Sequence, residues 1–88
     1  MKIKDGFWVR EVGGANIAVP VSGPARALKC VVNLNESGAL LFKLMQTETT
    51  AESMTRALLD AYDTTPQEAR RAADSFARQL LDARLLEE

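Results

Sequence analysis

The pattern of apolar residues changes its period once, at Asn35, and this change limits the folds that are open to the chain. Before Asn35, short runs rich in β-branched and aromatic residues are separated by turn residues, which is typical of strands. After Asn35, apolar residues recur every three or four positions, as they do on one face of an α-helix. A sheet built from the front of the chain and helices built from the back predict an α+β fold.

The segment that ends at Pro20 is expected to form a β-hairpin. Residues 7–12 alternate in character, and residues 16–19 resume a β-branched run after the turn signal Gly13-Gly14. We therefore expect two strands joined by a turn that spans Gly13 to Asn16. Because proline has no N–H to donate, Pro20 should end the second strand or place it at an edge.

A loop and a third strand should follow the hairpin. Residues 21–29 contain turn-forming residues such as Gly23 and Pro24, so this segment is predicted to be a loop. Residues 30–34 are largely apolar and predict a short strand. Alternation along that strand places Cys30, Val32 and Leu34 on one face and Val31 and Asn33 on the other.

Two helices are expected directly after this strand. Asn35 is a good N-cap for a helix over 36–46, because its side chain can accept a hydrogen bond from a free amide of the first turn. Gly38 is a weak helix former, but a small residue there permits close packing. Thr49 and Glu52 have the spacing of a capping box, which predicts a second helix over about 50–62.

The third helix has the clearest start signal in the chain. Thr65 is placed to cap it, Pro66 takes the first helical position, and Glu68 closes a capping box. The helix should continue to about Arg84, and Leu85-Leu86 should pack back onto the core. Six residues at helical spacing predict its core face: Ala69, Ala72, Ala73, Phe76, Leu80 and Ala83.

The expected order is therefore three strands followed by three helices, in one domain over residues 1–88. The second and third helices are joined by a short turn and form a helix-turn-helix unit. A three-stranded antiparallel sheet beside such a unit predicts a winged helix-turn-helix domain.

The composition removes most catalytic chemistry. The chain has no histidine and a single cysteine, Cys30. The commonest general base is therefore missing, and neither an internal disulfide nor a multi-cysteine zinc site can form. Cys30 also has no histidine that could activate it as a nucleophile. We expect a protein that is not an enzyme and that uses no cofactor and no metal.

The charge balance argues against nucleic acid as the partner. The chain has 11 basic and 12 acidic side chains, and residues 66–88 carry four basic side chains against five acidic ones. A recognition helix with this balance would gain little from phosphate contacts, so a DNA-binding winged-helix regulator stays only as an alternative. Residues 1–34 carry five basic side chains against two acidic ones, which favours an acidic peptide along the sheet.

The sequence also bears on location. Residues 1–6 lack the apolar stretch of a signal peptide. No apolar run approaches the roughly 20 residues that are needed to cross a bilayer. We therefore expect a cytoplasmic protein without a membrane partner.

The third strand leaves open what covers its outer edge. Proteins usually protect such edges with charged residues or proline, and residues 30–34 carry neither. The edge can be covered by the third helix. It can also be paired with a second copy in a dimerisation or scaffold domain, or extended by a strand from a partner peptide.

An ordered set of motifs resembles the PqqD-like family, also called RiPP recognition elements, over nearly the whole chain. The family's signature is a strand that ends in Leu-Asn-Glu-(Thr/Ser)-(Gly/Ala) just before the first helix, and Leu34-Asn35-Glu36-Ser37-Gly38 matches it. A Thr-x-x-Glu helix start, the Tyr62-Asp63 helix end and the C-terminal Leu85-Leu86 complete the set.

The resemblance implies a function. Such domains bind the leader segment of a ribosomally synthesised precursor peptide and present it to a modifying enzyme, often a radical-SAM protein, without performing chemistry themselves. The leader lies antiparallel along the third strand, in the groove between that strand and the third helix. We expect the protein to be a monomer or a weak homodimer. Carried onto this sequence, the resemblance implies contacts from Cys30, Val31, Val32, Asn33 and Leu34 and, on the third helix, from Arg70, Ala73, Asp74, Ala77 and Leu81.

Overall fold

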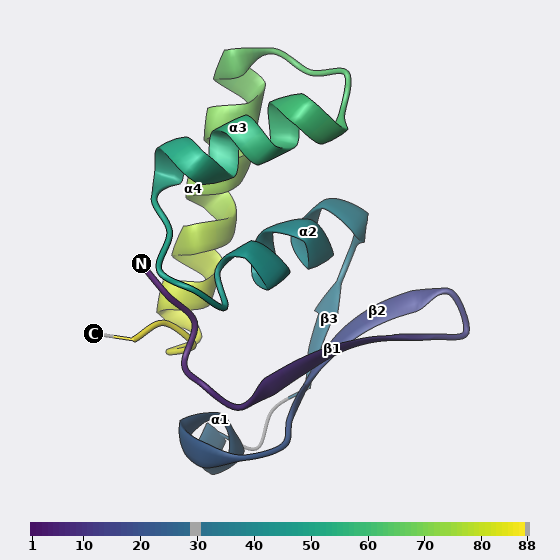
Figure 1. Cartoon of the computed structure of the whole chain (residues 1–88), viewed down its shortest axis with the longest axis vertical. Helices are drawn as coiled ribbons and strands as arrows, with labels where there is room; N and C mark the ends of the chain where they lie inside the picture. The colour runs from purple at the N-terminus through teal and green to yellow at the C-terminus, as the bar shows by residue number, and fades with distance from the viewer. Residues whose placement is uncertain (29–30, 88) are drawn as a thin grey trace.

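The computed structural model describes residues 1–28 and 31–87. It confirms an α+β fold with a three-stranded antiparallel sheet in the order β1-β2-β3. Figure 1 shows α2 between the sheet and α3, with α4 running past both helices toward the sheet. The elements are β1 (Phe7–Val12), β2 (Ala15–Pro20), α1 (Gly23–Leu28), β3 (Val32–Leu34), α2 (Glu36–Leu44), α3 (Ala51–Ala61) and α4 (Pro66–Asp82).

The β1–β2 hairpin turns over two residues. Val12 pairs with Ala15, and Gly13 and Gly14 between them have φ values of 58° and 83°. Two successive positive φ angles are what a type I′ turn requires, and glycine adopts them without strain. The predicted turn from Gly13 to Asn16 was too long, because β2 already begins at Ala15. The prediction that Pro20 ends the second strand is confirmed.

The segment predicted as a loop instead contains a short helix, α1. Ala25 is completely buried, and its N–H donates to the Asp5 carbonyl at 3.0 Å. Because a six-residue helix is unstable alone, these contacts with the rest of the molecule stabilise it, and a local sequence pattern does not report them. The winged helix-turn-helix description of the fold stays a prediction.

The helix starts are set by side-chain caps. The Asn35 Oδ1 accepts from the Gly38 N–H at 2.7 Å, and the Thr65 hydroxyl accepts from the Glu68 N–H at 3.2 Å, which confirms both predicted caps. The predicted cap Thr49 is wrong by one residue. Thr50 accepts from the Ser53 N–H at 3.1 Å, whereas Thr49 is buried and its N–H donates to the Met1 carbonyl.

The helix boundaries and the core face of α4 differ from the prediction in places. Helix α2 ends at Leu44 and α4 at Asp82, about two residues before the predicted ends. Ala69, Ala73 and Leu80 are buried as expected. Ala72 and Ala83 are exposed, because the buried stripe of α4 is narrower than the apolar spacing suggested.

The core lies on both sides of α2. Phe42 of α2 is completely buried, and its ring meets that of Phe7 edge to face with 5.6 Å between the ring centroids. Met45 and Met54 are completely buried as well. Helix α2 thereby joins the sheet to the helix pair. Among the described residues, no helix has the length and apolar character that a membrane crossing needs.

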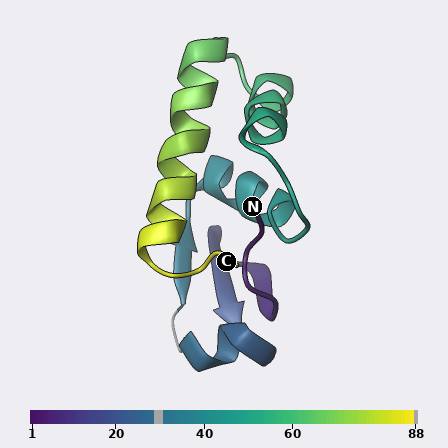
Figure 2. The same cartoon turned by 90° about the vertical axis from the view of Figure 1, so that its left-hand side faces the viewer.

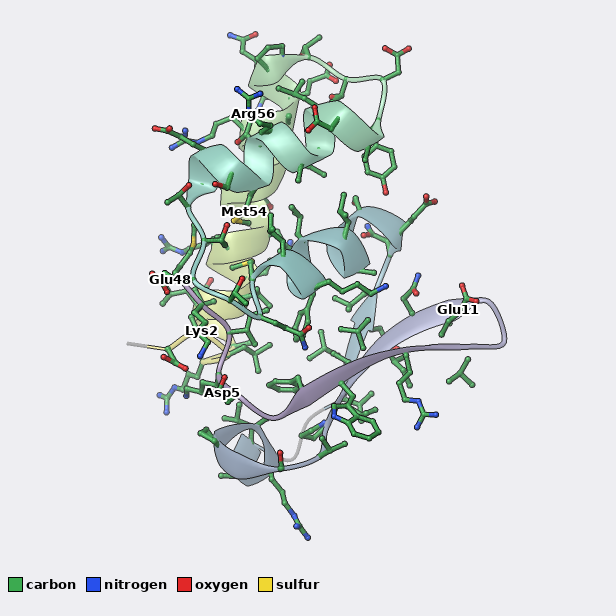
Figure 3. The ribbon with its side chains drawn as sticks, in the orientation of Figure 1. Lys2, Asp5, Glu11, Glu48, Met54 and Arg56 are labelled. Atoms are coloured by element: carbon green, nitrogen blue, oxygen red, sulfur yellow. The ribbon has the colours of Figure 1, made fainter. Side chains whose placement is uncertain are left out.

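The two ends of the described chain meet. Ile3 and Leu86 form an isolated antiparallel bridge, and the Lys4 N–H donates to the Leu85 carbonyl at 2.8 Å. Leu85 and Leu86 are buried, which confirms that this pair packs back onto the core. Figure 2 shows the two termini side by side next to the lower half of α4. In Figure 3, Lys2 lies beside Asp5, to which it forms an ion pair at 2.9 Å.

Candidate functional site

The outer edge of β3 offers unpaired backbone groups. In an antiparallel sheet, the N–H and C=O of successive residues point to opposite sides of the strand. The residues that flank a two-residue turn bond to each other, so the backbone groups of Ala15 face β1 and those of Asn16 and Ala18 face β3. The backbone groups of their partners on β3, Leu34 and Val32, therefore point toward β2. The backbone groups of Asn33, between them, point outward.

The side chains of this strand alternate as predicted. Leu34 is buried and Val32 is half-buried against the core, whereas Asn33 and Val31 are exposed, Val31 by 59%. Cys30, the first of the predicted contact residues, lies outside the described residues. A peptide at this edge would thus meet a backbone ladder with exposed side chains on one face and half-buried apolar ones on the other.

One flank of α4 lies next to the end of β3. A Cβ placed on Gly38 would lie 3.3 Å from Cε1 of Phe76 and 3.7 Å from Cδ2 of Leu34. The missing side chain at Gly38 therefore lets the first turn of α2 approach both residues closely. Phe76 is half-buried and marks the side of α4 that meets β3. We call this side the Phe76 flank, and helical spacing adds Ala72, Gln79 and Ala83 to it.

The helix residues proposed from the sequence lie elsewhere. Ala73 is completely buried in the core, so it has no surface that a peptide could contact. The other four line a groove together with Met1 and Leu86, and we call this side the Leu81 flank. Figure 1 shows both termini on one side of α4 and β3 on the other. The Leu81 flank consists of Arg70, Asp74, Ala77 and Leu81.

The two opposite charges on the Leu81 flank pair with each other. The Arg70 Nε lies 3.2 Å from Asp74 Oδ1, as an i,i+4 ion pair on the helix surface. Leu81 is 53% exposed. The structure therefore places Leu34, at the end of β3, near Phe76, whereas Arg70, Asp74, Ala77 and Leu81 line a groove with Met1 and Leu86.

The sequence does not predict that the Phe76 flank lies near β3, because helix rotation depends on tertiary contacts. The apolar spacing predicts Phe76 in the core, and in the structure it is half-buried. The useful signal was Gly38, because a glycine near the start of a helix indicates a close approach by another element. That signal does not say which residue approaches, so it could not select Phe76.

A pocket lies beyond the end of β3, between the start of α2 and α4. It is lined by Asn35, Ser37 and Ala72 and bordered by the carboxylates of Glu36 and Glu68. Tyr62 also lines it, and partial burial together with the neighbouring Glu36 carboxylate raises the pKa of the Tyr62 phenol.

Residues 1–28 and 31–87 contain no group of three or more His, Cys, Asp or Glu side chains placed to hold a metal ion. What the edge of β3 offers is the outward backbone N–H and C=O of Asn33, at the end of α4 that carries the largely apolar Phe76 flank. This arrangement suits an extended peptide, which can add a strand to the edge.

Comparison with known proteins gives one family and one related fold. Residues 28–86 match the family model described as Coenzyme PQQ synthesis protein D (PqqD). The chain is also similar to a solved structure described as "TbiB1 in Complex with the TbiA(beta) Leader Peptide", with a TM-score of 0.76 and 20% sequence identity over 99% of this chain and 95% of that chain. No curated protein matches the chain. At this identity, the structural similarity shows a shared fold.

Proposed function

The chain belongs to the PqqD family, and on this basis we propose that it binds the leader segment of a ribosomally synthesised precursor peptide. The leader adds an antiparallel strand to the outer edge of β3 and packs against the Phe76 flank of α4. The protein performs no chemistry on the peptide. It presents the peptide to a modifying enzyme, for which the family resemblance suggests a radical-SAM protein.

The observation that carries this proposal is the open edge of β3 beside an apolar helix flank. The outward backbone groups of Asn33 supply affinity without selecting a sequence. Half-buried Val32 and Phe76 offer apolar contacts to alternate side chains of the added strand. The related fold was solved with a leader peptide, which is consistent with this use of the edge.

The contact surface that we propose differs from the one expected from the sequence. On the strand it keeps Val31, Val32, Asn33 and Leu34, of which Leu34 is buried and lies close to Gly38, as Phe76 does. On the helix, the Phe76 flank replaces the residues of the Leu81 flank. Cys30 stays part of the proposed strand contact by its position in the sequence.

A binding measurement with an edge variant tests the proposal. Asn33→Pro removes an N–H that points away from β2, so it leaves the β2–β3 ladder intact. We expect the affinity for a synthetic leader peptide, encoded by a short reading frame beside the gene, to fall at least about tenfold in isothermal titration calorimetry.

Leu81→Ala is the matched control. It removes an exposed apolar side chain from the opposite flank of α4 and should leave the affinity within about twofold of the parent. Thermal unfolding of both variants checks that they are folded. Full affinity in a folded Asn33→Pro variant would contradict strand addition at β3.

A further inference from the structure

The sheet has a second open edge along β1. By the same alternation, the backbone groups of Phe7, Val9 and Glu11 point away from β2. Within the described residues, Gln46 covers one of these groups: its Nε2 donates to the Phe7 carbonyl at 2.9 Å. Pairing with β2 runs without a bulge over the whole strand, and β1 contains no proline. The edge therefore lacks two of the features that usually protect such strands.

A groove beside this edge carries positive charge. It is lined by Phe7, Trp8, Val9, Arg10, Lys43 and Gln46. Among the described residues, the lining contains two cations and no carboxylate, so a strand that occupies the groove is favoured if it carries an acidic side chain. Trp8 is 58% exposed at the same place, which leaves a large apolar surface for the occupant to cover.

We propose that the occupant is β1 of a second copy of this chain, paired antiparallel about a two-fold axis. The strand itself contains the acidic residue that the groove lacks, Glu11. Figure 3 labels Glu11 near the hairpin end of β1, and Figure 1 shows no helix or strand in front of β1. Self-pairing joins two three-stranded sheets into one continuous sheet across the axis.

Backbone geometry restricts the register of this pairing. Outward-pointing residues must pair with outward-pointing residues, so the axis passes through a pair of identical residues. The two registers with the longest overlap place it at Val9 or at Arg10. The Arg10 register sets two arginines directly opposite each other, which is destabilising. The Val9 register pairs Phe7 with the partner's Glu11 and contains no like-charged pair.

The Val9 register also matches the positive charge of the groove and the exposed surface of Trp8. It places Trp8 opposite the partner's Arg10 on the exposed face of the sheet, where the guanidinium can lie over the indole. It brings the partner's Glu11 next to Phe7, at the part of the groove that Lys43 and Gln46 line. The Phe7 carbonyl can still accept from Gln46, because a carbonyl oxygen has two lone pairs.

This interface is separate from the proposed peptide site. Strand β3 lies at the opposite edge of the sheet, so a dimer through β1 leaves both β3 edges open. The interface is small, so a weak, concentration-dependent association is expected. Each assembly could then hold two leader peptides, one at each end of the joined sheet.

Sedimentation equilibrium of the full chain tests the proposal. Between about 10 µM and 1 mM protein, the average mass should rise from that of one chain toward that of two. Trp8→Ala and Glu11→Lys should each raise the dimer Kd by at least about tenfold. The two-fold axis repeats every contact, so one substitution removes a contact from both halves of the interface. Both side chains are exposed, so the variants should fold, and thermal unfolding checks this.

Two controls fix the location of the interface. Val12 is as exposed as Trp8 but lies outside the paired segment of the Val9 register, so Val12→Ala should leave the dimer Kd unchanged. Asn33→Pro should also leave it unchanged. A monomer at every concentration would overturn the proposal, as would a dimer that Val12→Ala weakens as much as Trp8→Ala does. Loss of the dimer in Asn33→Pro would place the interface at β3 and would also overturn it.

Discussion

At the scale of single residues, the fold depends on two glycines for different reasons. Gly14 has a φ of 83° in the hairpin turn, and a Cβ built there would meet no atom within 4 Å. Gly6 has a φ of 109°, and a Cβ built there would lie 1.8 Å from the Ser22 carbonyl oxygen. The Gly6 carbonyl also accepts from the Val21 N–H at 2.8 Å, so the two backbones cannot separate without losing this bond.

We therefore predict that Gly6→Ala destabilises the protein much more than Gly14→Ala. Gly14→Ala should lower the free energy of unfolding by about 1 kcal/mol, the cost of a left-handed alanine. Gly6→Ala adds a backbone clash and should lower it by at least about 3 kcal/mol. Urea denaturation of the two variants measures both values. Equal losses would mean that Ser22 can move away from Gly6 at little cost.

The Tyr62 phenol makes the stability of the fold depend on alkaline pH. Its folded pKa is raised above the ordinary value of 10.0, by partial burial first and by Glu36 second. The neutral phenol therefore stabilises the fold below about pH 10, and this contribution is lost as the pH rises through the folded pKa. The raised pKa of Lys2, caused mainly by Asp5 and then by Glu87, acts in the same direction.

Unfolding free energies measured by urea denaturation between about pH 8 and 11 test this. Stability should fall at the alkaline end, and the fall should be smaller in Tyr62→Phe, which keeps the Lys2 contribution and lacks the titrating phenol. If Tyr62→Phe lost as much stability as the parent, the phenol would not be the source of the effect.

At the scale of elements, the rotation of α4 determines which of its residues can reach a peptide on β3. The helix carries one glutamine on each side, and both are exposed. Gln79 lies on the Phe76 flank by helical spacing. Gln67 lines the groove of the Leu81 flank. Substitution by glutamate changes the charge of either residue with almost no change in shape.

We predict that Gln79→Glu weakens leader binding and Gln67→Glu does not. The excess of basic side chains in residues 1–34 favours an acidic leader, which a new carboxylate on the Phe76 flank repels. Fluorescence anisotropy with a labelled leader peptide should show a Kd about three- to tenfold higher for Gln79→Glu. If Gln67→Glu raised the Kd more than Gln79→Glu did, the peptide would contact the Leu81 flank instead.

The elements themselves were largely predictable from the sequence. The local signals are strong where a cap or a turn requires one residue type, as at Gly13-Gly14, Asn35 and Thr65. They fail where distant contacts decide. Helix α1 depends on the burial of Ala25 against the rest of the fold. The peptide-facing side of α4 depends on how α4 packs against its neighbours, and neither is written in the local pattern.

At the scale of the whole molecule, the apolar pair Leu85-Leu86 connects the C-terminal segment to the N-terminal segment. Leu85 is only 2% exposed, and its carbonyl accepts from the Lys4 N–H. Leu86 pairs with Ile3, which is itself buried. The C-terminal segment, which follows α4, thus packs against the N-terminal segment, which leads into β1. These contacts help to hold α4 in its position beside the sheet.

Leu85→Ala should therefore lower the free energy of unfolding by about 2–4 kcal/mol. Leu81→Ala removes the same atoms from a site that is 53% exposed and should lower it by less than about 1 kcal/mol. Chemical denaturation compares the two directly. Similar losses would mean that the closure of the two ends contributes little to stability.

If a leader peptide adds a strand to the outer edge of β3, it must protect the backbone amide on that edge. Amide hydrogen exchange, followed by NMR for each residue with and without the peptide, measures this protection. The Asn33 N–H points outward, whereas the N–H groups of Val32 and Leu34 face β2 in both states. We expect peptide binding to slow exchange at Asn33 at least about tenfold and to change Val32 and Leu34 much less. Unchanged exchange at Asn33 in the saturated complex would rule out strand addition at β3.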